Sequence, residues 1–198
     1  MCSRLLLDRR SLQQCLSLAS SSPHEVPVGA LLRCNATQRI LATSSNASIS
    51  RHSSLAHAEM LALVSAQQSL SVSRLDNTTL YISLEPCLMC LGAALSSRVS
   101  RILFASRSPK YGSFSSPGGL ALQQGAHSPG GSSASSCSCS ASCPPPAWLL
   151  ASPVRLQVQC AEDSPALRDC AEASAALLSS FFASRRADKG GQRKPAVQ

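Results

Sequence analysis

Four residues in the middle of the chain have the types and the spacing of a hydrolytic metal site. His57 and Glu59 lie two positions apart, and Cys87 and Cys90 follow in a Pro-Cys-x-x-Cys pattern. A zinc ion that promotes hydrolysis commonly takes three His, Cys or carboxylate ligands and keeps a fourth position open. His57, Cys87 and Cys90 supply three ligands, so the sequence predicts Zn²⁺ as the cofactor. Glu59 would lie beside the ion without binding it, where it can transfer protons as the catalytic residue.

Each half of this pattern has another common meaning when it occurs alone. An isolated Cys-x-x-Cys is more often a redox pair or part of a structural zinc site. A structural site needs a fourth Cys or His, and none lies nearby in the sequence. The combined order, His-x-Glu followed by Pro-Cys-x-x-Cys, matches the signature of zinc-dependent nucleobase deaminases.

The surrounding pattern predicts elements that bring the ligands together. Residues 79–84 form an apolar strand that leads through Glu85 and Pro86 into a helix start. Residues 58–69 have the pattern of a helix whose inner side carries Met60, Leu61, Leu63 and Val64. All three ligands then lie at helix N-termini, where the helix dipole favours a thiolate over a thiol.

The other predicted elements complete one α/β domain. They are a helix over 11–20, strands over 25–32, 39–43, 101–106 and 154–159, and a helix that starts after Ser164-Pro165. The glycine at position 29 suggests that the backbone of the first strand approaches a neighbour closely. The last helix has an apolar stripe formed by Leu167, Cys170, Ala171, Leu177, Leu178, Phe181 and Phe182.

Composition divides the 198 residues into three parts. Residues 1–112 and 153–188 form the predicted single deaminase domain. Residues 113–152 are rich in Gly, Ser, Pro and Ala, so they bury too little apolar surface to offset their ordering cost, and we expect a disordered insertion. Its His127, Cys137, Cys139 and Cys143 match no standard zinc module. Residues 189–198 are expected to form a basic tail.

The charge of the chain suggests a phosphate-rich partner. The net charge is +8, and half of it comes from five Lys and Arg residues and one Asp between positions 185 and 194. A merely basic surface remains the alternative. No apolar run is long enough to span a membrane, and the first ten residues do not resemble a signal peptide. We expect a cytoplasmic protein with reduced cysteines and leave an organelle address open.

Several longer stretches resemble the tRNA-specific adenosine deaminases of the bacterial TadA type. The similarity rests on Glu25-Val-Pro-Val-Gly-Ala30, His57-Ala-Glu-Met60, Leu80-Tyr-Ile-Ser-Leu-Glu-Pro-Cys-Leu-Met-Cys90, Ser97-Arg98 and Leu177-Leu-Ser-Ser-Phe-Phe182. This resemblance implies a three-layer αβα cytidine deaminase-like fold with a five-stranded mixed sheet. It also implies a homodimer that binds the tRNA anticodon loop and converts the wobble adenosine to inosine.

The resemblance assigns further binding residues. By itself Asn46 is best interpreted as a turn residue, but it falls at the family's base-contacting asparagine. Ala58 would contact the base through its backbone, Ser108 would lie near the ribose, and Arg185 and Arg186 would hold the tRNA. Ser108 stands where the family usually has an acidic residue, and Ser53-Ser-Leu55 replaces the usual residues before Ala-His.

Two other functions remain open from the sequence. One is a deaminase of a free nucleobase or nucleotide of the cytosine or guanine type, although a small substrate has no need of a basic helix. The other is a non-catalytic RNA-binding subunit of a deaminase complex. Such a subunit is expected to have lost the glutamate, whereas Glu59 is present.

Overall fold

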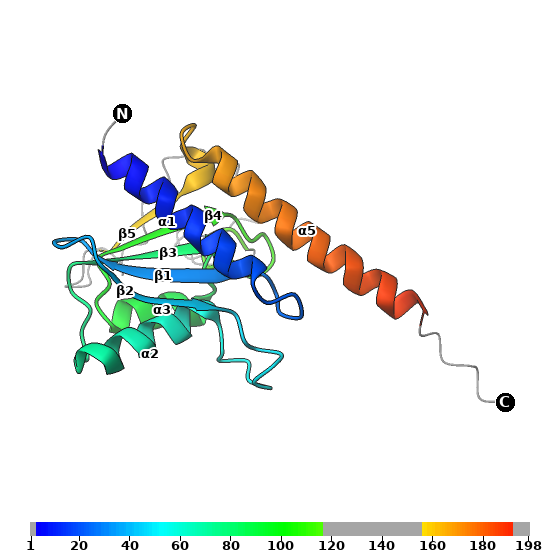
Figure 1. The fold of residues 1–198 in the computed structure, drawn as a ribbon, viewed down its shortest axis with the longest axis horizontal. Coiled ribbons are helices and arrows are strands. Elements are labelled where there is room, and N and C mark those ends of the chain that lie inside the picture. The colour runs from blue at the N-terminus through cyan, green and yellow to red at the C-terminus, as the bar shows by residue number, and fades with distance from the viewer. Residues whose placement is uncertain (1–2, 117–155, 192–198) are drawn as a thin grey trace, which may run out of the picture.

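The computed structural model describes residues 3–116 and 156–191. They form a five-stranded mixed sheet with the strand order β2-β1-β3-β4-β5 and with helices on both faces (Figure 1). This confirms the predicted three-layer αβα fold. The elements are α1 (Ser3–Ser20), β1 (Gly29–Cys34), β2 (Ile40–Ser45), α2 (Ala58–Leu70), β3 (Thr78–Leu84), α3 (Leu88–Ser96), β4 (Arg101–Ser106), β5 (Gln157–Cys160), the 3₁₀ turn η2 (Ala161–Asp163) and α5 (Arg168–Gly191).

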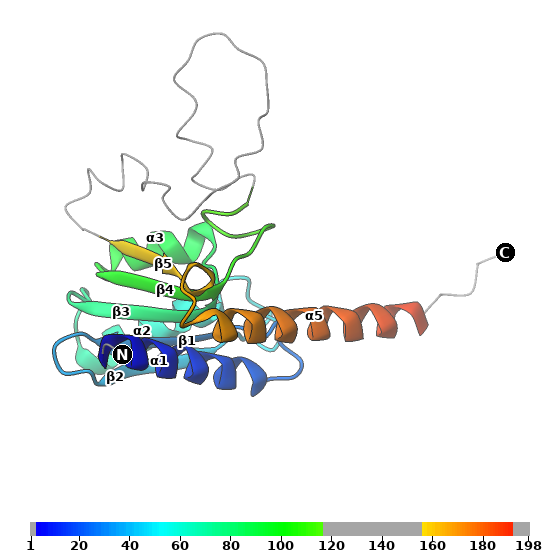
Figure 2. The same cartoon turned by 90° about the horizontal axis from the view of Figure 1, so that it is seen from above.

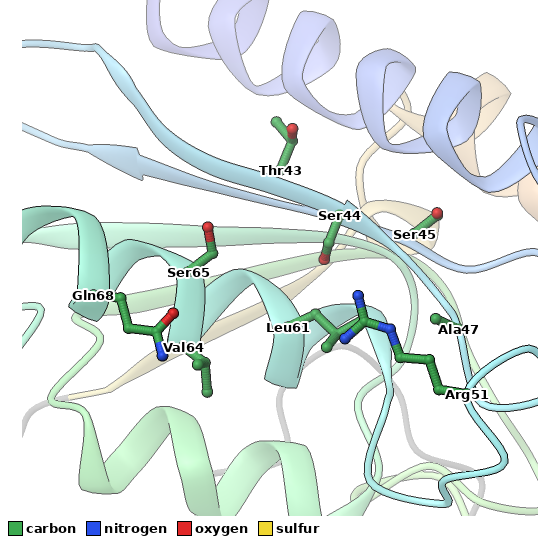
Figure 3. A pocket seen from close by; sticks show the side chains of 9 residues that line it. All are labelled: Thr43, Ser44, Ser45, Ala47, Arg51, Leu61, Val64, Ser65 and Gln68. Carbon is green, nitrogen blue, oxygen red and sulfur yellow. The ribbon is translucent and has the colours of Figure 1, made fainter.

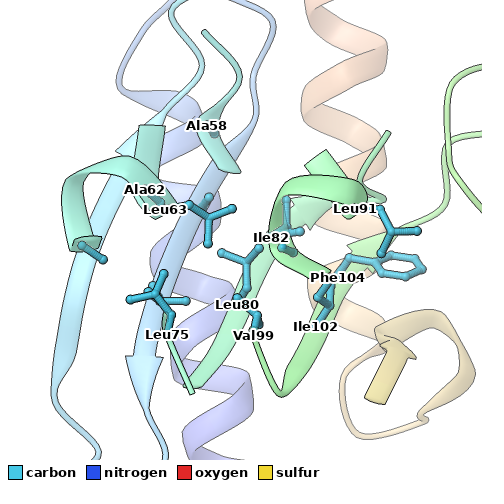
Figure 4. Packing of buried hydrophobic residues seen from close by; sticks show 14 of the residues in the cluster. Ala58, Ala62, Leu63, Leu75, Leu80, Ile82, Leu91, Val99, Ile102 and Phe104 are labelled. Carbon is cyan, nitrogen blue, oxygen red and sulfur yellow. The ribbon is translucent and has the colours of Figure 1, made fainter. Parts of the chain in front are cut away.

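The central strands are buried on both faces because helices cover both sides of the sheet. α1 and α5 pack on one face and α2 and α3 on the other (Figures 1 and 2). Side chains alternate between the faces. On β3, Leu80 and Ile82 join the cluster under α2 and α3 (Figure 4), while Tyr81 joins the cluster under α1 and α5. Ile102 and Leu103 on β4 divide between the two clusters in the same way.

The strand directions decide where the loops meet. β1 pairs antiparallel with β2 and β3, whereas β3, β4 and β5 run parallel, with Leu84 opposite Ser106. The segments that follow β3 and β4 therefore leave the sheet at the same edge. Both views place the loop after β2, the loop after β4 and the free end of α5 on this side of the molecule (Figures 1 and 2).

The first helix begins earlier than its apolar pattern predicts. α1 starts at Ser3, not near position 11, because its first turns are held by a buried carboxylate. Asp8 accepts two 2.8 Å hydrogen bonds from the Arg101 guanidinium and one of 2.7 Å from the Tyr81 hydroxyl. A charged residue inside a helix does not signal burial in the sequence, so the prediction missed these turns.

The other boundaries shift by a few residues. β1 begins at Gly29 rather than at position 25, and a Cβ on Gly29 would lie 2.1 Å from the Cys15 carbonyl oxygen. This confirms the predicted close approach. The prediction that Val64 faces inward is wrong, since it is 44% exposed. α2 buries smaller side chains, Ala62 and Ala66, against the sheet.

The C-terminal helix also differs from its prediction. α5 begins at Arg168, and it continues through Gly191 into the segment predicted as a basic tail. Only the first half of its apolar stripe is buried: Leu167, Cys170 and Ala171 are in the core, whereas Phe182 is 46% exposed. No described helix is both long and apolar enough to cross a membrane.

The first residues of the predicted insertion belong to the folded domain. Ser113 is fully buried, and Phe114 packs against the core cluster under α2 and α3. The described domain therefore extends to Ser116 rather than ending at position 112. The rest of the predicted insertion, with the alternative metal ligands His127, Cys137, Cys139 and Cys143, lies outside the described residues.

Candidate metal centre

The three predicted ligands come together at the start of two helices. His57 is the N-cap residue of α2, and Cys87 is the N-cap residue of α3, each with an extended backbone conformation. Cys90 lies in the first turn of α3. β3 delivers Cys87 to this point through Glu85 and Pro86, as the sequence predicts. Among the described residues, these three are the group of His, Cys and acidic side chains that is arranged to hold a metal ion.

The distances within this group fit zinc. His57 Nδ1 lies 3.6 Å from Cys87 Sγ and 3.5 Å from Cys90 Sγ, and all three atoms lie within 4.8 Å of one another. A tetrahedral zinc ion with Zn–N of about 2.05 Å and Zn–S of about 2.3 Å would separate nitrogen and sulfur by about 3.5 Å. The ligand atoms therefore already have the spacing of a zinc site with three protein ligands.

The electrostatics of the thiols favour metal binding. Hydrogen bonds from the Cys90 thiol and the His57 ring lower the pKa of Cys87 to about 4, although burial opposes the shift. The pKa of Cys90 is raised, first because its thiol donates to Cys87 and second because it is buried. One ligand is thus a thiolate at neutral pH, and the second sulfur is aimed at the same point.

Glu59 lies beside the ligands and is separated from solvent. It occupies the first turn of α2 and is 4% exposed. Burial raises the pKa of its carboxyl group, and the neighbouring His57 lowers it in part. A buried carboxyl group next to a metal site can accept a proton from one group and donate it to another.

Asn46 is held in a defined orientation by a buried acid that the sequence prediction did not assign a role. Its Nδ2 donates to Glu25 Oε2 at 3.2 Å, and its Oδ1 accepts from the Ser48 hydroxyl at 3.2 Å. Glu25 also accepts the backbone N–H groups of Ile49 at 3.0 Å and Ser50 at 2.6 Å. Burial raises the pKa of Glu25, but these hydrogen bonds together outweigh it and hold the pKa below its ordinary value.

The other two predicted contacts near the base are differently placed. Ala58 is the fully buried first residue of α2, and its carbonyl oxygen accepts a hydrogen bond from the Ser44 hydroxyl. Ser108 lies after β4, where its N–H donates to Glu85 Oε2 at 2.8 Å. This hydrogen bond connects the loop that follows β4 to the segment that carries Cys87.

Glu85 is the second buried acid whose role the prediction missed. Its other oxygen, Oε1, accepts the N–H groups of Phe114 at 2.8 Å and Ser115 at 2.9 Å. A carboxylate between an apolar strand and a proline would have been a usable signal, because a buried charge needs hydrogen-bond donors. The donors come from residues 23 to 30 positions away, so the sequence could not identify them.

Arg185 and Arg186 are not part of the metal centre. Both are exposed on α5, which extends beyond the edge of the sheet on the side of the metal site (Figures 1 and 2). Arg185 lies over the Phe181 ring, with 5.2 Å from its guanidinium carbon to the ring centroid. The rings of Phe181 and Phe182 meet edge to face at 5.3 Å.

A separate groove of about 460 Å³ lies between β2 and the outward side of α2 (Figure 3). It contains none of the metal ligands. Val64 and Arg51 are part of its lining, together with several hydroxyl side chains. It is therefore a surface feature next to the metal centre and not the reaction site itself.

Comparison with known proteins agrees with this geometry. Residues 7–106 match the model of the cytidine and deoxycytidylate deaminase zinc-binding region. A tRNA-specific adenosine deaminase from Buchnera aphidicola subsp. Schizaphis graminum is 45% identical over 82 residues, which are 41% of this chain and 53% of that protein. The chain spans about half the length of the first curated relatives that it matches.

Solved structures share the fold. A structure from studies of A-to-I editing by tRNA deaminases at the wobble position of transfer RNA has a TM-score of 0.51 and 33% identity, over 54% of this chain and 82% of that one. A guanine deaminase from Nitrosomonas europaea has a TM-score of 0.60 at 21% identity, over 92% of this chain and 94% of that one, and it supports the fold alone. With its matched region, its sheet and its three metal ligands, this chain belongs to the family defined by the cytidine and deoxycytidylate deaminase zinc-binding region.

Proposed function

We propose that this chain is a zinc-dependent hydrolase that deaminates adenosine to inosine at the wobble position of tRNA anticodons. The observation that carries the proposal is the site of three ligands, His57, Cys87 and Cys90, with the buried Glu59 beside it and not part of it. Three ligands leave a coordination position for water, which a structural site does not. The names of relatives that are 45% and 48% identical over about half of their length support the tRNA substrate.

Proton transfer falls to Glu59 in this reaction. Zinc, when bound, supplies the activation of a water molecule for hydrolysis. Glu59 accepts one proton as the water oxygen adds to C6 of the adenine and passes it to the ring nitrogen N1. It then accepts the remaining proton of the new C6 hydroxyl group and passes it to the amino group, which leaves as ammonia while the C6 carbonyl forms. Its burial keeps bulk water away from these transfers.

The orientation of Asn46 suits recognition of the base. The amide group has two N–H donors and an oxygen with two lone pairs. Glu25 and Ser48 use one donor and one acceptor. Because Glu25 accepts several other hydrogen bonds, the NH₂ group of Asn46 must face it, which leaves one donor and one acceptor for the edge of a purine.

The position of α5 supports binding of a long polyanion. Arg185 and Arg186 project from a helix that continues past the sheet on the side of the metal site, where phosphates next to a bound anticodon would lie. The Ser108 hydroxyl would contact the ribose and would accept a hydrogen bond more weakly than a carboxylate.

The six described cysteines are free, which is consistent with a cytoplasmic protein.

We also propose that the chain forms a homodimer through the face that carries α2. The groove in Figure 3 and the exposed Val64 lie on this face. Val64→Glu should convert a dimer into a monomer in light scattering coupled to size-exclusion chromatography. Leu6→Glu is the matched control, because Leu6 is 42% exposed on α1 across the sheet. A monomeric wild type, or a dimeric Val64→Glu, would contradict this interface.

The reaction itself is tested by replacing Glu59. In Glu59→Ala all three ligands remain, so zinc content and binding of an anticodon hairpin should stay near wild type. Inosine formation at the wobble adenosine should fall by at least about 10³-fold, because one residue handles several proton transfers. Asp76→Ala, which removes an exposed acid beyond the far end of α2, is the control and should be fully active.

The substrate is tested with the wild type. Free adenosine, cytidine and guanine are offered beside the hairpin, and each product is measured. Conversion of the free compounds alone would overturn the tRNA substrate and favour a nucleobase or nucleotide deaminase. Hairpin binding without any turnover in the zinc-loaded wild type would indicate a non-catalytic RNA-binding subunit.

A further inference from the structure

The loop after β4 is fastened to the segment that carries a metal ligand. The Ser113 N–H and hydroxyl both donate to the Pro86 carbonyl oxygen, at 2.9 and 2.8 Å, and Pro86 precedes the ligand Cys87. Glu85 accepts from Ser108, Phe114 and Ser115, which lie on both sides of the loop tip. The loop and the ligand segment therefore form one unit, so the loop has a fixed position relative to the metal centre.

The tip of this loop is a short turn directly above Glu85. Gly112 N–H donates to the Ser108 carbonyl oxygen at 2.8 Å and closes the turn around Pro109, Lys110 and Tyr111. Gly112 packs so tightly on the Glu85 carboxylate that a Cβ there would lie 2.3 Å from it. A side chain at position 112 would force the turn and the Glu85 carboxylate apart. The glycine therefore allows the turn to pack directly against the segment that carries Cys87.

Tyr111 is presented outward from this anchored turn. It is 66% exposed, more than the other large hydrophobic residues that are exposed in the described part of the chain. The Lys110 ammonium lies 4.9 Å from the centroid of its ring. An aromatic ring next to a cation, on a rigid support beside a reaction site, has the features of a nucleotide contact: the base stacks on the ring and the phosphate meets the cation.

We propose that Tyr111 is a stacking platform for the unpaired nucleobase next to the one that reacts. The inference rests on the proposed function, because it assumes a single-stranded RNA substrate whose target base enters the metal centre. A base drawn out of a stacked loop leaves its neighbour without a stacking partner, and an exposed ring on a loop that is bonded to the ligand segment can replace that partner. Glu85 is then a positioning residue, which acts through the loop and does not touch the substrate.

The first test measures binding of an anticodon hairpin at fixed ionic strength. Tyr111→Ala should weaken binding by about 5- to 150-fold, the range for one stacked base, whereas Tyr111→Phe should bind like wild type. Leu70→Ala is the control, since it removes a 46% exposed side chain at the far end of α2 from His57.

The second test removes the base instead of the ring. Hairpins with an abasic nucleotide on either side of the target should bind wild type more weakly at one of the two positions. At that position Tyr111→Ala should show no further loss, since the two changes remove the same contact. Equal losses in wild type and Tyr111→Ala at both positions would overturn the stacking role, and so would unchanged binding of the intact hairpin by Tyr111→Ala.

The role of Glu85 has its own signature. Glu85→Gln with full zinc content should weaken hairpin binding although Tyr111 is present, and adding Tyr111→Ala should weaken it little further. Additive losses would overturn the positioning role. If the wild type deaminates the hairpin and Tyr111→Ala binds it normally, this inference alone fails. If the wild type neither binds nor deaminates the hairpin, the proposed function fails and the inference with it.

Discussion

Single buried acids organise the residues around the metal centre. Glu25 orients Asn46 and holds the loop that follows β2, and Glu85 holds the loop that follows β4. Each carboxylate accepts hydrogen bonds from several N–H groups. These bonds replace the hydrogen bonds to water that the charge lost on burial. Residues 46–57 after β2 and the described residues 107–116 after β4 contain no helix or strand, and in each segment several N–H groups donate to one carboxylate.

The Glu25 network should make stability depend on pH. The pKa of Glu25 is below its ordinary value in the folded chain, so its stabilisation is fully present above the unfolded pKa of about 4.3 and is lost as the pH falls through the folded pKa. Glu25→Gln should lower the free energy of unfolding by about 1–3 kcal/mol at pH 7. Denaturant titrations of both proteins from pH 7 to pH 3 should show this difference shrinking below about pH 4. A constant difference would contradict the linkage.

At the scale of elements, two ion pairs of different kinds hold α1, one to β4 and one to α5. Asp8 pairs with Arg101 in the interior, where the side chains are 5% and 6% exposed. Arg9 pairs with Asp169 at the surface at 2.6 Å, where the side chains are 39% and 48% exposed. Only the first pair excludes water, so the two should differ greatly in their effect on stability.

This contrast gives a matched pair of mutations. Asp8→Ala should destabilise the chain by about 3–5 kcal/mol, because it leaves the Arg101 charge and the Tyr81 hydroxyl buried without their acceptor. Asp169→Ala should cost less than about 1 kcal/mol, because water replaces an exposed partner. Chemical denaturation of the two variants measures both values. Equal values would show that burial does not decide the strength of the α1 attachment.

Zinc should also stabilise the arrangement of elements, because its ligands lie at the N-termini of both α2 and α3. A ligand that binds only the folded chain raises stability in proportion to its binding free energy. Removing zinc with a chelator should therefore lower the melting temperature of the wild type, and returning zinc should restore it. In Cys90→Ala the melting temperature should be low and should respond little to either treatment. Calorimetry with zinc analysis checks both.

At the scale of the whole molecule, charge and shape favour one side for RNA. The net charge is +8, and α5 carries Arg185 and Arg186 beyond the sheet on the side of the metal centre. Replacing both with Gln should weaken hairpin binding. It should also reduce the slope of log Kd against log salt by about 1.4–1.8, from two lost phosphate contacts. Arg74→Gln, an exposed charge after α2, is the control. An unchanged slope would exclude these contacts.

The residues of the metal centre and the class of fold could be predicted from local sequence patterns. His57, Cys87 and Cys90 are local in two short motifs that sit at helix starts, so their spacing along the chain limited their arrangement in space. The strands and helices are also recognised from local apolar patterns, so their order along the chain was enough to predict a three-layer αβα fold. The predicted roles of Asn46, Ala58, Ser108, Arg185 and Arg186 came from family resemblance, and their contacts with RNA stay predictions.

The way in which the surrounding loops and helices are held depends on contacts between distant parts of the chain. Asp8, Glu25 and Glu85 are charged residues that periodicity assigns to the surface, yet each is buried with donors 21 to 93 positions away in the chain. The packing of Ser113 and Phe114 likewise depends on Glu85 and Pro86, not on their own Gly- and Ser-rich surroundings. Local patterns carry no record of such long-range hydrogen bonds, because the partners meet only after the strands have paired and the helices have packed on the sheet.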